Sequence, residues 1–192
     1  MQLNALTVNG DLDRGESLGQ SLQALGHIVV ADIADDANLL AAVEAHHPDV
    51  LLIRCDSPGD ALLCALRELS LNTPLPVLLF TAARDRDLIH RAVRAGVSAY
   101  VVDGLSSGRL DSILEVAIVR FSETQRLRRE LADVRANLAE RKAVERAKGI
   151  LMKQRGFDEP QAYHALRKMA MDRNLRIGEV AENVIAVADL LN

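Results

Sequence analysis

Polar residues follow the short aliphatic runs of this sequence, at the points where each run ends. In an open parallel sheet, ligands and catalytic groups gather just outside the carboxyl ends of the strands. We therefore expect these residues to share one pocket. Six residues have this position: Asn9, Asp11, Arg54, Asp56, Thr81 and Asp103.

The elements that must position this pocket are short strands that alternate with helices over the first 105 residues. Strands are predicted at 3–8, 28–32, 50–53, 77–80 and 99–102, and helices at 13–25, 37–46, 59–71 and 86–95. The strand segments are continuously apolar instead of alternating, which is typical of a parallel sheet buried on both faces. The sequence predicts a doubly wound α/β domain with a five-stranded parallel sheet.

The sequence of the second half of the chain predicts helices and no strands. Residues 109–148 contain neither Gly nor Pro, which favours one long helix. Shorter amphipathic patterns follow at 159–173 and 177–191 and, with the end of the long helix near Arg155, predict a small three-helix bundle. We expect domains at 1–120 and 142–192, joined by a coiled-coil linker at 121–141.

The linker carries apolar residues at the 4-3-4 spacing of a coiled coil. They are Leu127, Leu131, Val134 and Leu138. About two heptads fit in this segment, whereas three or four are needed for a firm prediction of a coiled coil. The pattern favours a homodimer; the alternative is a stripe that packs back on its own chain.

Charge divides the chain into an acidic front and a basic rear. Residues 1–114 have a net charge of −7, whereas residues 126–176 hold 14 basic and 7 acidic side chains. This asymmetry favours a polyanionic partner for the second half. No apolar run approaches the ~18 residues of a membrane span and no leader opens the chain, so we expect a soluble cytoplasmic protein.

Composition and spacing argue against catalysis. No nucleophile–base pair, metal-ligand cluster or phosphate loop appears, so we expect no enzyme, no metal and no cofactor. Cys55 and Cys64 lack ligand neighbours and form no disulfide framework. We expect both to be buried free thiols in a reducing compartment.

The basic helices present candidates for binding RNA. Tyr163 and Arg167 are i, i+4 neighbours on one helix, and Lys168 is adjacent. An aromatic ring beside cationic groups suits a base stacked above a phosphate backbone, although a solvated basic face and a partly buried Tyr163 are also common. The candidate contacts are Lys148, Lys153, Tyr163, Arg167 and Lys168.

The pocket residues, with Tyr100, resemble the receiver domain of bacterial response regulators over the first 120 residues. That resemblance implies acids that bind Mg²⁺ and an Asp that accepts a phosphoryl group, but here Arg54 stands at the acceptor position. A guanidinium neither accepts phosphoryl nor ligates Mg²⁺. Asp103 stands where the family has Lys. We therefore predict an Arg54–Asp103 contact, shared with Asp11 or Asp56; that Arg54 points to solvent is the alternative.

The C-terminal fifty residues resemble the ANTAR domain of bacterial antiterminators. The matching residues are Ala-Lys-Gly-Ile-Leu-Met at 147–152, Ala162-Tyr163, Leu166-Arg167 and Ala170-Met171. The resemblance implies a dimer that binds two-hairpin leader RNA and prevents a terminator from forming. It also implies that small residues such as Ala147 and Gly149 allow close helix packing and access to RNA.

Two further segments, Asp56-Ser57-Pro58 and residues 99–105, resemble NasT-type regulators of nitrate and nitrite assimilation. This similarity implies control by a NasS-like nitrate/nitrite sensor protein instead of phosphorylation. Two alternatives stay open: a response regulator phosphorylated on Asp56, and a DNA-binding transcriptional regulator, although no recognition helix with several base-reading side chains is evident.

Overall fold

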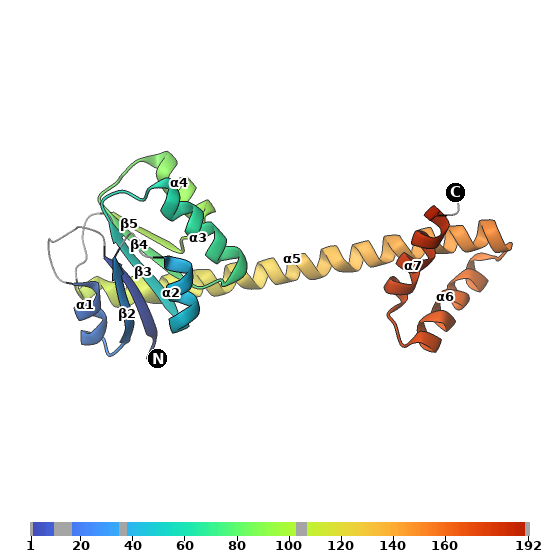
Figure 1. Ribbon diagram of the computed structural model, residues 1–192, viewed down its shortest axis with the longest axis horizontal. Helices are drawn as coiled ribbons and strands as arrows, with labels where there is room; N and C mark the ends of the chain where they lie inside the picture. Colours follow the sequence, from blue (N-terminus) through green and yellow to red (C-terminus); the bar gives the residue numbers. More distant parts are fainter. Residues whose placement is uncertain (1, 10–16, 35–37, 103–106, 191–192) are drawn as a thin grey trace. The chain divides into compact units, whose positions relative to one another are not determined.

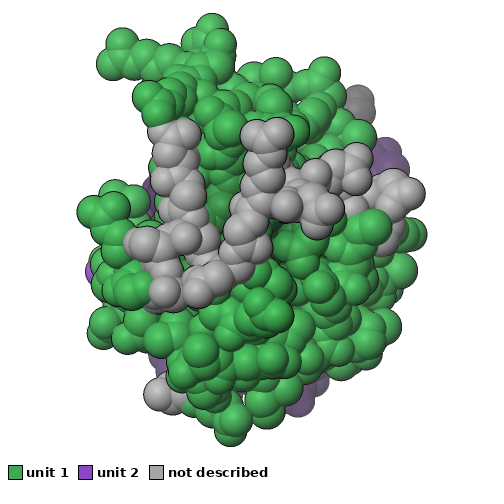
Figure 2. All heavy atoms as spheres, turned by 90° about the vertical axis from the view of Figure 1, so that its left-hand side faces the viewer, with its two compact units in different colours: residues 1–125 green, residues 126–192 purple. Residues whose placement is uncertain are grey.

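The chain divides into two compact units. The computed structural model describes residues 2–9, 17–34, 38–102 and 107–190. Unit 1 comprises residues 1–125 and unit 2 residues 126–192, coloured green and purple in Figure 2. The finer predicted division at 1–120, 121–141 and 142–192 stays a prediction, because one helix runs without a break through both of its boundaries.

Unit 1 is built on the predicted five-stranded parallel sheet (Figure 1). The strand order is β2-β1-β3-β4-β5. Every residue of the central strands β3 and β4 is buried, as expected for strands covered on both faces. The strands are β1 (Asn4–Asn9), β2 (Ile28–Ala34), β3 (Val50–Cys55), β4 (Val77–Thr81) and β5 (Ala99–Val102).

Helices cover both faces of this sheet, which confirms the doubly wound arrangement. The helices α2 (Leu39–His46), α3 (Asp60–Asn72) and α4 (Arg86–Arg94) pack on the face that carries Ile53 and Leu79. The opposite face is covered by α1 (Leu18–Ala24) and the first part of α5 (Ser107–Arg155). Two separate apolar layers therefore hold the sheet.

Four strands extend one or two residues beyond their predicted ends. The parallel ladder continues through polar residues, because Asn9 pairs with Arg54 and Cys55 pairs with Thr81. Arg54 therefore lies inside β3 and not after it, which corrects the predicted strand boundary at Ile53. Helix α1 begins at Leu18, after Ser17 as N-cap; the predicted start at 13 falls outside the described residues.

Unit 2 packs the last turns of α5 against α6 (Glu159–Arg173) and α7 (Ile177–Leu190). Val144, Leu166 and Val180 contribute one residue from each helix to its core. A Cβ added at Gly178 of α7 would lie 2.7 Å from Cγ of Glu140, so this glycine allows close approach to α5. The predicted three-helix bundle is confirmed.

The two cysteines differ in exposure. Cys55 is buried in β3, as expected, whereas Cys64 is exposed on α3, so the prediction of two buried thiols is wrong. Leu63 and Leu66 are the α3 residues beside it that face the core. Within the described parts of the chain, every helix is too short or too polar to span a bilayer.

Candidate functional site

Arg54 occupies the switch point of the sheet, where the chain order reverses between β1 and β3. It pairs in register with Asn9 of β1 and with Phe80 of β4. Only 9% of the residue is exposed, and this burial lowers the pKa of the guanidinium. The alternative that Arg54 points to solvent is therefore wrong. A fixed cation lies where ligands bind in open α/β sheets.

Asn9 is held by an acid that sequence reasoning missed. The Asn9 side-chain amide donates to Oδ1 of Asp32 at 2.6 Å, and the Thr7 hydroxyl donates to the same oxygen at 2.6 Å. Thr7 and Asp32 pair in register across β1 and β2. The available signal was a carboxylate inside the otherwise aliphatic run of the second strand.

The Thr81 hydroxyl joins the loops that follow β3 and β4. It donates to the backbone carbonyl of Asp56 at 2.6 Å and accepts a hydrogen bond from the Ala83 backbone N–H at 3.2 Å. The Tyr100 hydroxyl donates to the Ala83 carbonyl at 2.9 Å, and burial raises the pKa of this phenol. Both hydroxyls therefore fix backbone, while the Asp56 residue is exposed.

Two members of the predicted pocket, Asp11 and Asp103, lie outside the described residues. The predicted Arg54–Asp103 contact therefore stays a prediction. Within the described ranges, no group of three or more His, Cys, Asp and Glu side chains could hold a metal ion. The structure thus brings Asn9, Arg54 and the Thr81–Asp56 hydrogen bond to one edge of the sheet.

In unit 2, α6 has an inner apolar face and an outer polar face. Ala162, Leu166 and Ala170 are buried, as the amphipathic pattern predicts. Tyr163 and Arg167 are exposed one turn apart, and 47% of Tyr163 is accessible. Figure 1 shows α6 in unit 2 beside α7.

The exposed face of α6 also contains a residue that was not selected as a contact. Met171 lies one turn beyond Arg167 and is 73% exposed. Lys168 is exposed on the same helix, and Lys153 is exposed near the end of α5. Four of the five candidate contacts are thus exposed, and Met171 lies on the same face of α6 as Tyr163 and Arg167. Its place in the quoted motif was the signal that pointed to it.

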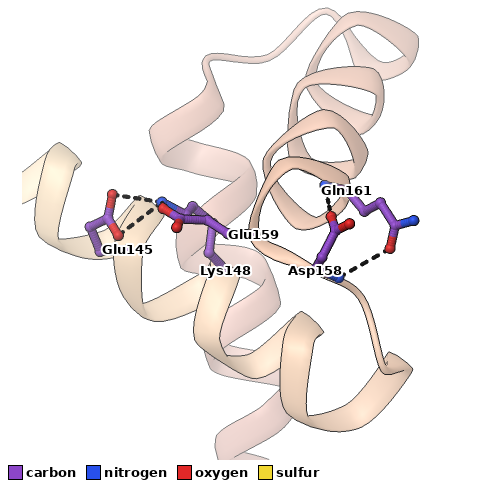
Figure 3. Close-up of polar contacts among 5 residues, drawn as sticks. All are labelled: Glu145, Lys148, Asp158, Glu159 and Gln161. Carbon is purple, nitrogen blue, oxygen red and sulfur yellow. Dashed lines mark hydrogen bonds and ion pairs between the residues drawn. The ribbon is translucent and has the colours of Figure 1, made fainter.

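Lys148 differs from the other four candidates because it is buried and paired. Its ammonium donates to both Glu145 carboxylate oxygens at 2.9 Å and to Oε1 of Glu159 at 2.7 Å (Figure 3). Only 7% of the residue is exposed. The hydrogen bonds that the ammonium donates to Glu159 and Glu145 raise its pKa, and the same contact with Lys148 lowers the pKa of Glu159. The contact ties α5 to the first residue of α6.

The start of α6 is fixed a second time by a capping box. Asp158 accepts from the Gln161 backbone N–H at 2.8 Å, and the Gln161 side chain accepts from the Asp158 backbone N–H at 3.0 Å (Figure 3). Two otherwise unpaired N–H groups of the helix end are satisfied in this way. Gln161 stands three residues after Asp158, which is the spacing of a capping box.

The four apolar residues of the predicted coiled coil are exposed in the single chain. Their exposed fractions lie between 50% for Leu131 and 63% for Val134. Within unit 2, α6 and α7 leave this stripe uncovered. The four residues are Leu127, Leu131, Val134 and Leu138.

Known proteins resemble both units. The ANTAR domain family matches residues 132–185. The chain is 34% identical over 168 residues to the transcriptional regulatory protein PdtaR of Mycobacterium tuberculosis, a match that covers 88% of this chain and 82% of PdtaR. It is 43% identical over 83 residues to the nitrate regulatory protein of Klebsiella oxytoca, which covers 43% of this chain and 21% of that protein.

For the fold of unit 1, a signal receiver domain of a modulated diguanylate cyclase from Desulfovibrio desulfuricans G20 superimposes with a TM-score of 0.54 at 20% identity. The superposition covers 65% of this chain and 99% of that domain. It supports the receiver fold alone. Together with the match to PdtaR over most of both chains, the ANTAR domain shows that this chain belongs to the family of ANTAR-domain regulators with a receiver-like first domain.

Proposed function

We propose that the chain is a transcription antiterminator that binds two-hairpin leader RNA through its ANTAR domain. The observation that carries this proposal is the exposed stripe of α6 within the matched region, where Tyr163 and Arg167 lie one turn apart beside Lys168. Single-stranded hairpin loops are recognised by stacking of unpaired bases on aromatic rings and by cationic groups on phosphates. Met171 extends this surface by one turn of α6, and Lys153 is exposed near the end of α5.

The exposed stripe from Leu127 to Leu138 supports a homodimer. Large apolar side chains at coiled-coil spacing are stabilised when a second helix covers them. Two copies joined at this stripe present two α6 surfaces, which matches an RNA element with two hairpins. Dimerisation therefore belongs to the proposed binding mode.

Control by a partner protein agrees with the altered receiver pocket. Arg54 replaces the phosphoryl acceptor, is 9% exposed and cannot be phosphorylated as an aspartate is. The similarity to a nitrate regulatory protein favours a NasS-like sensor of nitrate or nitrite as the partner and nitrate/nitrite assimilation genes as the target. In this proposal the protein acts in the cytoplasm, without catalysis or a cofactor.

A gel shift tests RNA binding directly. Leader RNA hairpins are compared with duplex DNA of matching sequence at several salt concentrations, because a purely electrostatic complex does not distinguish them. We expect preferential retention of RNA, weakened by Arg167→Ala. Arg67→Ala removes the same charge from unit 1 and serves as the matched control, with unchanged RNA binding. Equal affinity for both nucleic acids would refute the proposal.

The phosphorylation alternative has its own measurement. The protein is incubated with acetyl phosphate and Mg²⁺ and its intact mass is recorded. We expect no added phosphoryl group. An adduct that disappears in Asp56→Asn would show that the exposed Asp56 carboxylate replaces the missing acceptor, and control by phosphorylation would then stand.

A further inference from the structure

An open groove of about 820 Å³ lies between α3 and α4 on the surface of unit 1. One stripe of α3 lines it with Asp60, Leu63, Cys64 and Arg67, which follow the i, i+3, i+4, i+7 spacing of a single helix face. The facing helix α4 supplies Arg91 and Arg94, together with its C-cap residue Ala95. The site described above uses none of these seven residues.

The charge of this groove is opposite to that of its domain. Three arginines and one aspartate line it, whereas residues 1–114 carry a net charge of −7. Arg91 forms an ion pair with Asp60. Among the residues that the structure describes, Arg67 and Arg94 form no ion pair. Two guanidinium groups thus remain available beside a neutralised third.

The floor of the groove is apolar. Leu63 and Ala95 are 6% and 5% exposed beneath the arginines. One turn beyond Arg67 on α3, Leu71 is 74% exposed. Arginine forks pair with carboxylates in a bidentate geometry, and an apolar floor accommodates aliphatic side chains. This combination suits a short segment that carries both acidic and aliphatic residues.

We propose that this arginine groove, formed by the seven residues above, is the docking site for an acidic amphipathic segment of a partner protein. The inference deepens the proposed control by a partner, on which it rests, by assigning the partner's surface and the chemistry that recognises it. An RNA strand is a less suitable occupant, because its extended polyanion meets the negative charge of the surrounding domain.

Cys64 provides a reporter inside the groove. Its thiol is exposed, and Cys55 is buried, so fast thiol modification of the folded protein reports on Cys64 alone, with Cys64→Ser as the blank. The anionic disulfide reagent DTNB is compared with the cationic disulfide cystamine. A field that concentrates anions raises association rates by about tenfold or more, so we expect DTNB to be preferred by about tenfold relative to a small model thiol.

Charge variants test the origin of that preference. The double variant Arg67→Gln, Arg94→Gln should reduce the preference for DTNB over cystamine to that of the model thiol. Asp60→Asn should increase this preference, because it releases Arg91 from its ion pair. About 1 M salt should abolish the preference for DTNB, because charges are then screened from one another beyond about 3 Å. A preference that is absent in the wild type, or unchanged in the double variant, would overturn the inference.

Protection of Cys64 by a peptide tests which kind of ligand occupies the arginine groove. A short amphipathic peptide of Glu and Leu should protect Cys64 from modification, and the same peptide with Gln for Glu should not. Equal protection by an RNA hairpin would assign the groove to nucleic acid, and protection that rises with protein concentration alone would assign it to a second copy. Either result, or no protection by the acidic peptide, would overturn the proposed docking site.

Leader-RNA gel shifts of the same variants separate this inference from the proposed function. We expect the Arg67→Gln, Arg94→Gln variant to bind RNA as the wild type does. Failure of RNA binding in every variant and in the wild type would refute the antiterminator proposal while leaving the groove measurements valid. Loss of RNA binding in the double variant alone would place these arginines on the RNA surface and overturn the docking site.

Discussion

Lys148 and Lys168 carry the same charge in the same helical unit, yet the structure gives them different surroundings. Lys168 is exposed on α6, whereas the Lys148 ammonium is 2.7 Å from Glu159 and 2.9 Å from Glu145. We predict that Lys168→Ala changes the salt dependence of RNA binding and that Lys148→Ala does not. Each variant removes one positive charge, so the long-range electrostatic effect is matched.

The magnitude follows from counterion release. Each lysine that neutralises a phosphate contributes about 0.7 to 0.9 to the slope of log affinity against log salt concentration. Between about 50 mM and about 200 mM salt, one contact therefore changes affinity by about threefold. If Lys153, Arg167 and Lys168 each contact one phosphate, the fall in affinity over this salt range should be about thirtyfold smaller when all three are replaced by alanine. Lys148 is already paired with carboxylates and should contribute none.

Fluorescence anisotropy of a labelled leader hairpin, measured at several KCl concentrations, gives these slopes. Thermal melting of the same proteins provides the second measurement. We expect Lys148→Ala to lower the melting temperature, because it leaves Glu159 without its cation, and Lys168→Ala to leave it unchanged. If Lys148→Ala flattens the slope as much as Lys168→Ala without loss of stability, the ion pairs open to admit RNA and the reasoning is refuted.

Three other changes test separate parts of the structure. Gly149→Ala should stabilise the protein by about 0.5–1 kcal/mol, since among the described residues nothing outside the neighbouring backbone of α5 lies within 4 Å of the added Cβ; a lower melting temperature would contradict this. Leu131→Glu should convert the proposed dimer to a monomer in sedimentation, since half of Leu131 is exposed in the single chain, and an unchanged mass would contradict the proposed coiled coil. The pKa of Glu159 lies below its usual 4.5 in the folded protein, so its stabilisation is complete above about pH 4.5 and is lost as pH falls through the lowered value. Melting curves between pH 3 and pH 6 should therefore converge for wild type and Glu159→Gln at the acid end, and parallel curves would argue against the pair.

Local backbone chemistry explains why the C-terminal ends of the helices could be predicted to within one residue. Gly26, Gly96 and Gly156 have positive φ angles, and so does Asn174, in the left-handed conformation that ends a helix. The predicted helix from 159 to 173 has the observed bounds, because Asp158 and Asn174 mark its ends. Such signals act within a few residues and are therefore visible in the sequence.

The exposure of single side chains depends on distant partners and could not be predicted in the same way. Glu145 lies one turn before Lys148, but Glu159 reaches it only after the chain reverses at Gly156. The same limit applies to Cys64, whose exposure depends on how α3 rests on the sheet. Sequence pattern identified the helices that carry the candidate contacts, and only packing separated the paired lysine from the exposed ones.

The loops at the altered receiver pocket lead into α3 and α4, the two helices that line the arginine groove. The Thr81 hydroxyl joins these loops by donating to the Asp56 carbonyl at 2.6 Å. One loop ends at Asp60, the first residue of α3, and the other at Arg86, the first residue of α4. The charge of the Arg54 guanidinium is permanent, so it cannot be added and removed as a phosphoryl group is. The Thr81–Asp56 hydrogen bond therefore links the two loops, and each loop leads into a helix that lines the arginine groove.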